Sequence, residues 1–287
     1  MNRKNSHIYA KRIQLGISLV ELMVGVAIGL LVVSVAVGAL MVSRNISGTV
    51  SDATMIQQQA AYAMRVIGSQ IRQAGSLRLN LDARSTGSIE YLTQVGIETK
   101  APAVGGGNGF FPKKDSISGT DNFISLAYRR YKEASFSAAA DTSLSRNCLG
   151  GPADASEDQR LESIFDVNGS QLRCDGNGAG AQPIANNVAD FQIRYLRQDN
   201  SEKGNSKMQR VLGSAVANWA QIQGVEVCLV MYGNEPIEIP VGSSYVGCDG
   251  NNVDLNSLTG VRARRLHLVF RNTFQMRSQG LAASEGI

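Results

Sequence analysis

The stretch ISLVELMVGVAIGLLVVSVAVGALMV, residues 17–42, decides how this chain is organised. It contains one charged residue, Glu21, and as a helix it would be about 39 Å long at a rise of about 1.5 Å per residue. The hydrocarbon core of a bilayer is about 30 Å thick, so the stretch is long enough to cross a membrane. We therefore predict a membrane-spanning helix over residues 17–42.

A short basic leader, MNRKNSHIYAKRIQLG, precedes this stretch and ends at Gly16. It contains no acid and four bases, Arg3, Lys4, Lys11 and Arg12. Because basic flanks stay on the cytoplasmic side, we expect one membrane pass with the C-terminus in the periplasm. No small-residue cleavage site of the A-x-A kind follows the apolar stretch, so ordinary secretory cleavage is not expected there.

Glu21 is unusual because it lies inside the apolar stretch. A carboxylate at mid-bilayer costs up to about 2.5 to 3.5 kcal/mol, somewhat less near an end, and such groups usually have a partner. A plain signal anchor explains the apolar residues but not the carboxylate. We therefore expect another group to meet Glu21.

The sequence G-I-S-L-V-E, residues 16–21, resembles the class III signal of type IV pilins and type II secretion pseudopilins. This resemblance implies that prepilin peptidase cuts between Gly16 and Ile17 and methylates the new terminal amine. It also implies that Glu21 pairs with a terminal amine in the assembled fibre. The family usually has Phe where this chain has Ile17, which is also apolar.

Small residues recur one helical turn apart within the apolar stretch. Gly25 and Gly29 are separated by three residues, as are Ser34 and Gly38. Small residues at this spacing let a second helix approach closely, although such spacings are frequent in spanning helices. We expect these four positions to be candidates for helix packing.

Residues 43–75 continue the helical pattern without a break, since the first proline is Pro102. Apolar residues recur at steps of three, four or seven: Ile46, Val50, Ala53, Ala60, Met64, Ile67, Ile71 and Ala74. These positions share one helix face, and Gly75 follows as a stop signal. We predict an amphipathic helix half over residues 43–75.

Residues 76–287 change to Gly, Ser, Asn and short alternating runs, which predict a β-rich head. Half-buried strands are predicted over residues 122–128, 191–195, 225–231 and 265–270. Asn168-Gly169 is a strong two-residue hairpin signal, because both positions accept a positive φ. The predicted fold class is α+β, with the long helix packed against an antiparallel sheet.

A narrower resemblance lies at the end of the helix. QQAAYAMRVIGSQIRQAG, residues 58–75, resembles the segment of the PilW family of minor pilins that ends in I-R-Q-A-G, and residues 188–195 and 261–266 are similar to later segments of that family. The resemblance implies a low-abundance subunit that helps to start a fibre and lies near its tip. The partners implied are prepilin peptidase, other minor pilins, the major pilin and a large tip adhesin.

Four cysteines fall in the predicted head: Cys148, Cys174, Cys228 and Cys248. An even number in an oxidising compartment favours disulfides. Three pairings exist, of which proximity favours Cys148 with Cys174 and Cys228 with Cys248. A zinc site is the rival interpretation, but no C-x-x-C spacing supports it.

Charge argues against a general nucleic-acid binder. The chain has 28 Lys and Arg against 24 Asp and Glu, and removal of the four leader bases leaves 24 against 24. Tyr128-Arg129-Arg130-Tyr131-Lys132 mixes bases with aromatics as single-strand binders do, but a solvated strand end is the favoured interpretation. Nucleic acid is therefore not an expected partner.

Catalytic and cofactor signals are scarce. The glycine-rich runs 105–107 and 176–180 lead into neither Lys-Ser/Thr nor a clear helix, so they predict loops rather than phosphate sites. His267 is the one histidine beyond the leader and is expected to be a packed or surface imidazole. Asp166, Asn168 and Ser170 imitate the start of a calcium loop, but the glycine falls at the wrong place. We expect no enzyme activity, no metal and no cofactor.

Three functional hypotheses remain from the sequence. A minor pilin explains the leader, Glu21, the long helix and the neutral head together, and predicts residence in the inner membrane and then in a fibre at the cell surface. A minor pseudopilin of a type II secretion system shares the N-terminus and differs in its partners. A membrane-anchored DNA-uptake or adhesion receptor explains only the head.

Overall fold

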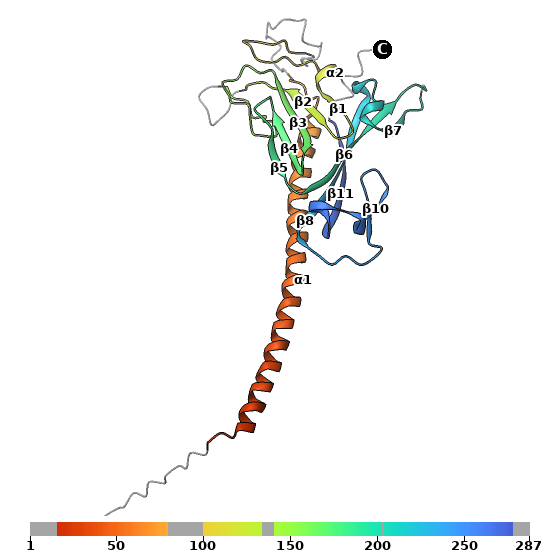
Figure 1. The fold of residues 1–287 in the computed structure, drawn as a ribbon. Coiled ribbons are helices and arrows are strands. Elements are labelled where there is room, and N and C mark those ends of the chain that lie inside the picture. The colour runs from red at the N-terminus through yellow and green to blue at the C-terminus, as the bar shows by residue number, and fades with distance from the viewer. Residues whose placement is uncertain (1–15, 80–99, 134–140, 203, 278–287) are drawn as a thin grey trace, which may run out of the picture. The chain divides into compact units, whose positions relative to one another are not determined.

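The computed structural model describes residues 16–79, 100–133, 141–202 and 204–277 (Figure 1). Two compact units divide the chain between Gly48 and Thr49. One helix, α1 (Leu19–Gln73), contributes to both, and no proline interrupts it. The leader predicted over residues 1–16 lies outside the described residues except for Gly16.

In the first unit, α1 is apolar and exposed. The stretch Leu19–Met41 has a mean hydropathy of 2.6, and none of it is buried. Within Leu19–Met41, large side chains are exposed on every side of the helix; Leu31, for example, is 65% exposed. A helix that is apolar on every side requires a protein core or a membrane around it. Leu19–Met41 is long and apolar enough to cross a bilayer.

The second unit contains two larger antiparallel sheets and a small hairpin. The first sheet has the order β1 (Ile117–Gly119), β2 (Ile124–Arg129), β3 (Arg160–Asn168), β4 (Gln171–Gly176) and β5 (Gln182–Ala185). The second has the order β11 (Arg265–Gln275), β8 (Ile222–Pro236), β6 (Val188–Asp199) and β7 (Lys207–Val211). The small hairpin pairs β9 (Ser244–Val246) with β10 (Asn252–Asp254).

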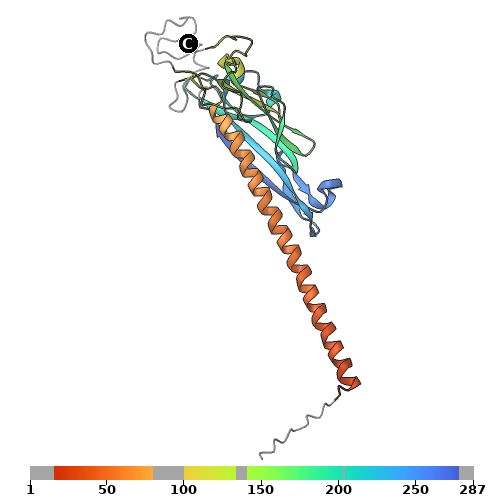
Figure 2. The ribbon, with the colours of Figure 1, turned by 90° about the vertical axis from the view of Figure 1, so that its left-hand side faces the viewer.

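Short helical segments complete the unit: α2 (Pro112–Asp115), η2 (Gly213–Ala215), η3 (Trp219–Gln221), η4 (Leu255–Ser257) and η5 (Gly260–Arg262). Figure 2 shows the second half of α1 running along the strands. The predicted α+β class, with a long helix against antiparallel sheet, is confirmed.

One hydrophobic core joins the second half of α1 to both larger sheets. The buried helix positions are Ile56, Ala60, Ala63, Met64, Ile67, Ile71 and Ala74. They meet residues such as Phe165 of β3, Phe191 of β6 and Leu229 of β8. Burying one such large side chain stabilises the fold by about 1.5–3 kcal/mol. Val50, predicted on this face, is 60% exposed, because the buried apolar positions begin at Ile56.

The C-terminal strand closes this core at the end of α1. Phe274 of β11 packs against Gly68, where a side chain of any size would collide with the ring. The guanidinium of Arg72 lies over the same ring, 5.8 Å from its centroid. A glycine at position 68 therefore allows the close approach between helix and strand.

Polar side chains of α1 fix the helix against the strands. Three of them accept hydrogen bonds from the head: Asp52 from the Glu235 N–H (2.6 Å), Gln59 from the Asn186 N–H (3.0 Å) and Gln70 from the Ser163 hydroxyl (2.9 Å). Because hydrogen bonds are directional, they fix the position of α1 along the strands. Apolar packing alone would define this position less sharply. The apolar periodicity did not reveal these contacts.

Asp52→Ala should lower the thermal midpoint of the full chain in detergent. Asp52 is buried, and its removal leaves the Glu235 N–H without its acceptor, which costs about 1–3 kcal/mol. Asp52→Asn keeps a carbonyl acceptor and should lose less. Circular dichroism melts of both variants would measure the difference, and an alanine variant as stable as the native chain would contradict this role.

Two sequence expectations about strands need correction. β2 was expected to be half buried, but all six of its residues are buried, because it is an interior strand covered on both faces. The β3–β4 hairpin forms as predicted, yet its two-residue loop is Gly169-Ser170, since Asn168 pairs with Gln171. Gly169 alone has a positive φ, +62°, which is the pattern of a turn with glycine first.

Candidate functional site

The predicted processing residues lie just before α1 begins. Gly16 and Ile17 are exposed, and Ile17 is 75% exposed. A Cβ built on Gly16 would meet nothing within 4 Å. The peptide bond between these residues is therefore accessible within the described structure.

The start of α1 is capped by a serine that the sequence analysis overlooked. The Glu21 N–H donates to the Ser18 hydroxyl oxygen at 3.2 Å. Ser18-x-x-Glu21 matches the capping-box pattern, in which Ser caps the helix and Glu or Gln follows three residues later. Glu21 also lies in the first turn, where its negative charge complements the helix dipole. The Glu21 backbone thus takes part in the cap, and the pairing predicted for its side chain stays a prediction.

The predicted packing positions are open in the single subunit. Cβ atoms built on Gly25, Gly29 and Gly38 would meet nothing within 4 Å. The Ser34 hydroxyl donates to the Leu30 carbonyl oxygen at 2.8 Å, so its polar group is satisfied within the helix. Packing of another helix on these positions stays a prediction.

The structure contains both disulfides that spacing favours, Cys148–Cys174 and Cys228–Cys248. Cys174 belongs to β4 and Cys228 to β8, so each bond ties a connecting segment to a strand. Their sequence separations are 26 and 20 residues. Each loop closure is worth about 3 kcal/mol in the chain-entropy model.

Peptide mapping of the chain purified without reductant should recover Cys148 linked to Cys174 and Cys228 linked to Cys248. Replacing both members of one pair with serine should destabilise the head by about 3 kcal/mol, because the unfolded chain regains the loop entropy. Replacing a single member should be worse, because it also leaves a reactive thiol. Free thiols throughout the native preparation would refute the pairing.

The basic segment at the end of β2 is solvated only at Lys132, so the favoured interpretation of a solvated strand end is wrong for its two arginines. Arg129 and Arg130 are 6% and 2% exposed. The Arg130 guanidinium donates to a set of backbone carbonyl oxygens: Ala153, Asp154, Ser156 and Asp158. These carbonyls replace water, which allows the charge to be buried, while burial lowers the pKa of Arg130. Arg130 therefore shapes the 153–158 loop and does not offer its charge to phosphate.

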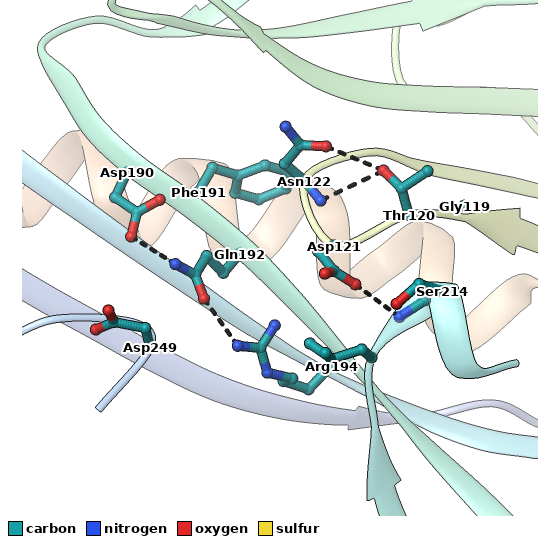
Figure 3. A pocket seen from close by; sticks show the side chains of 12 residues that line it. Gly119, Thr120, Asp121, Asn122, Asp190, Phe191, Gln192, Arg194, Ser214 and Asp249 are labelled. Atoms are coloured by element: carbon teal, nitrogen blue, oxygen red, sulfur yellow. Dashed lines mark hydrogen bonds between the residues drawn. The ribbon is translucent and has the colours of Figure 1, made fainter. Parts of the chain in front are cut away.

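A cavity of about 680 Å³ lies between β6, the 119–122 turn and η2 (Figure 3). Gln192 donates to Asp190 and accepts from Arg194, both at 3.0 Å, and Asp121 accepts from the Gly213 N–H at 2.8 Å. Burial, helped by the charge of Asp249, raises the pKa of Asp190. The lining contains no histidine, cysteine or lysine, and Gln192 links Asp190 to Arg194 along β6.

The remaining candidate residues have structural partners. Asp166, from the calcium-like pattern, accepts two hydrogen bonds from the Arg173 guanidinium across the β3–β4 hairpin, at 3.1 and 2.6 Å. Within the described residues, no three His, Cys, Asp or Glu side chains form a group that could hold a metal. His267 is a packed imidazole, 6% exposed.

Comparisons with known proteins give similarity to solved structures only. No protein-family model matches the chain, and no curated protein matches it. Among solved structures, the chain is similar to a type IV-like pilin from Thermus thermophilus at 12% identity and a TM-score of 0.36, over 78% of this chain and 98% of that one. Similarity at this level does not identify a function.

Proposed function

We propose that the chain is a minor pilin of the PilW type, cleaved between Gly16 and Ile17 and then built into a type IV pilus near its tip. One observation supports it best. The G-I-S-L-V-E signal leads directly into an exposed apolar helix, and the same helix continues as the packing face of a β-rich head. A secretory signal or a plain anchor would not need to be continuous with the core of the exported domain.

In this proposal each part of the chain has its own task. Residues 1–16 are a cytoplasmic leader that prepilin peptidase removes. Residues 17–42 hold the subunit in the inner membrane and later join the helices inside the fibre. Residues 43–75 carry the periplasmic head, residues 76–287, into the fibre. Exposed Leu19–Met41 side chains need such apolar surroundings at both stages.

The partners in this proposal follow from the exposed helix and from the resemblance. Other minor pilins and the major pilin would cover the helix, and a large tip adhesin would bind the head. A DNA receptor is less well supported, because the aromatic and basic segment that suggested it holds Arg129 and Arg130 buried. A minor pseudopilin of a type II secretion system remains the second candidate, since the signal at residues 16–21 serves both systems.

The proposal can be tested by deleting the gene and examining both assemblies. A minor pilin predicts fewer surface fibres, restoration by the native chain, and small amounts of the mature chain in sheared, purified fibres by mass spectrometry. A pseudopilin predicts normal fibres and loss of protein secretion instead. Normal fibres together with normal secretion would overturn the assignment to either assembly.

A further inference from the structure

The connection between β8 and β11, residues 237–264, forms a separate small layer on the head. It contains β9, β10, η4 and η5, and its ends meet where the Ile237 N–H donates to the Arg264 carbonyl oxygen at 2.8 Å. The Cys228–Cys248 disulfide ties its middle to β8. Besides this covalent bond, the Arg271 guanidinium of β11 donates to the Gly247 and Cys248 carbonyl oxygens, and Tyr245 packs on a small apolar cluster that includes Val230 of β8. Further side-chain contacts lie around His267.

His267, on β11, packs between two tyrosines. Its ring stacks on Tyr245 of β9, with centroids 5.4 Å apart and planes at 11°. On β8, Tyr232 lies 6.0 Å away at 32°. The Arg262 guanidinium of η5 donates to the Tyr245 hydroxyl at 3.3 Å. The imidazole therefore connects the sheet to β9, and Tyr245 in turn connects to Arg262 of η5.

The buried surroundings of this imidazole favour its neutral form. Nδ1 lies 2.9 Å from the Arg265 carbonyl oxygen, which can only accept, so Nδ1 carries the proton. Nε2 is buried and has no hydrogen-bond partner among the described residues. A second proton would add an N–H and a positive charge there. The facing groups are Arg262, Tyr232 and Tyr245, and none of them is an anion that could balance the charge.

We propose that His267 is a proton-sensitive latch, which holds the 237–264 layer against the sheet while its imidazole is neutral and releases it in acid. The inference does not depend on the pilin assignment, because it rests only on contacts within the head. The event is uptake of one proton from solvent at Nε2. The disulfide stays intact, so release is a local loosening of the layer rather than unfolding of the head.

The sign of the pH effect follows from burial. Burial lowers the pKa of His267 and the nearby Arg262 lowers it further, while the bond to the Arg265 carbonyl opposes both. In the released layer the imidazole would titrate near its ordinary value of about 6.5. The 237–264 layer is therefore fully docked on the sheet above about pH 6.5. Below that pH, the equilibrium constant for docking falls by up to about tenfold per pH unit for one proton. The docking constant stops falling once the pH is below the lowered pKa of the docked imidazole.

Hydrogen exchange measured by mass spectrometry on the full chain in detergent micelles tests this latch. Between pH 7.5 and 5, and after correction for intrinsic amide rates, exchange in residues 237–264 should rise relative to β6. His267→Phe keeps an aromatic ring that cannot be protonated, so its layer should show no such rise. Equal acid sensitivity of the native and phenylalanine chains would overturn the latch.

A titration of His267 itself keeps the proposal testable if the phenylalanine variant fails to fold. The only other histidine is His7, so His7→Gln leaves a single imidazole for NMR. We expect the His267 resonance to titrate below the ordinary pKa, together with shifts in Tyr245. An ordinary or raised pKa would refute the proposal.

Discussion

Gly16→Val should leave the chain at full length, with its leader still attached. The uncleaved chain should be absent from fibres. A peptidase must hold the chain in an extended form close to its catalytic groups, and glycine alone offers no side chain to obstruct that approach. We expect cleavage to be abolished rather than slowed, since valine branches at Cβ, next to the scissile bond. N-terminal mass spectrometry of membrane and fibre fractions would measure the fraction of the chain that is cleaved.

The structure supplies a matched control for this variant. Gly16 and Gly38 both have nothing within 4 Å of a built Cβ, so valine at either position causes no clash within the subunit. Gly38→Val should therefore be cleaved normally, although it changes a predicted packing position. Normal maturation of Gly16→Val, or equal failure of both variants, would contradict the assigned cleavage site.

Glu21→Lys should still be cleaved but should join the fibre at least about tenfold less well than the native chain. If the carboxylate meets a terminal amine, lysine replaces attraction by repulsion in surroundings that screen charge poorly. A difference of about 1.4 kcal/mol is already tenfold in an equilibrium, and an unpaired charge inside a membrane costs more than that. Crosslinking and pull-down at matched expression, with counts of surface fibres, would measure the effect.

The Ser18 cap makes it possible to separate two roles of Glu21. Glu21→Gln removes the charge but suits the capping box, whereas Ser18→Ala removes the cap and keeps the charge. Charge pairing predicts that glutamine is defective, as Glu21→Ala should be, and that Ser18→Ala assembles nearly normally. A functional glutamine variant beside a defective Ser18→Ala would assign the role to helix capping and would refute charge pairing.

Membrane retention gives an independent check on the Glu21 variants. Because a carboxylate is costly in lipid, Glu21→Ala should stay in the membrane at least as well as the native chain. Its defect should therefore appear only in association with other subunits. Loss of the alanine variant from the membrane before assembly would show that its weak incorporation has another cause.

The sequence predicted the large features of the fold because they depend on periodicity. The apolar run and the three- and four-residue spacing of Ala60, Met64, Ile67 and Ile71 defined α1 and its buried face. The alternating runs located β2, β6, β8 and β11. Periodicity does not report how many faces of a strand are covered, which is why the full burial of β2 was missed.

Other features depend on partners distant in sequence. The burial of Arg130 requires carbonyl groups of the 153–158 loop, and the burial of Asp52 requires the end of β8. A charged side chain read in isolation is assigned to the surface, because its partner contributes no local signal. The Ser18 cap is different, since its S-x-x-E pattern was readable from the sequence and was overlooked.

The contact of Phe274 with Gly68 has a consequence for the timing of folding. α1 is made before β11, yet the two must meet before the core is closed. Contacts between such distant parts of a chain form slowly and leave apolar surface uncovered meanwhile. During synthesis there is therefore a stage at which α1 is complete but β11 is not yet present to cover it. The apolar face of α1 around Gly68 therefore stays open until β11 brings Phe274 onto it.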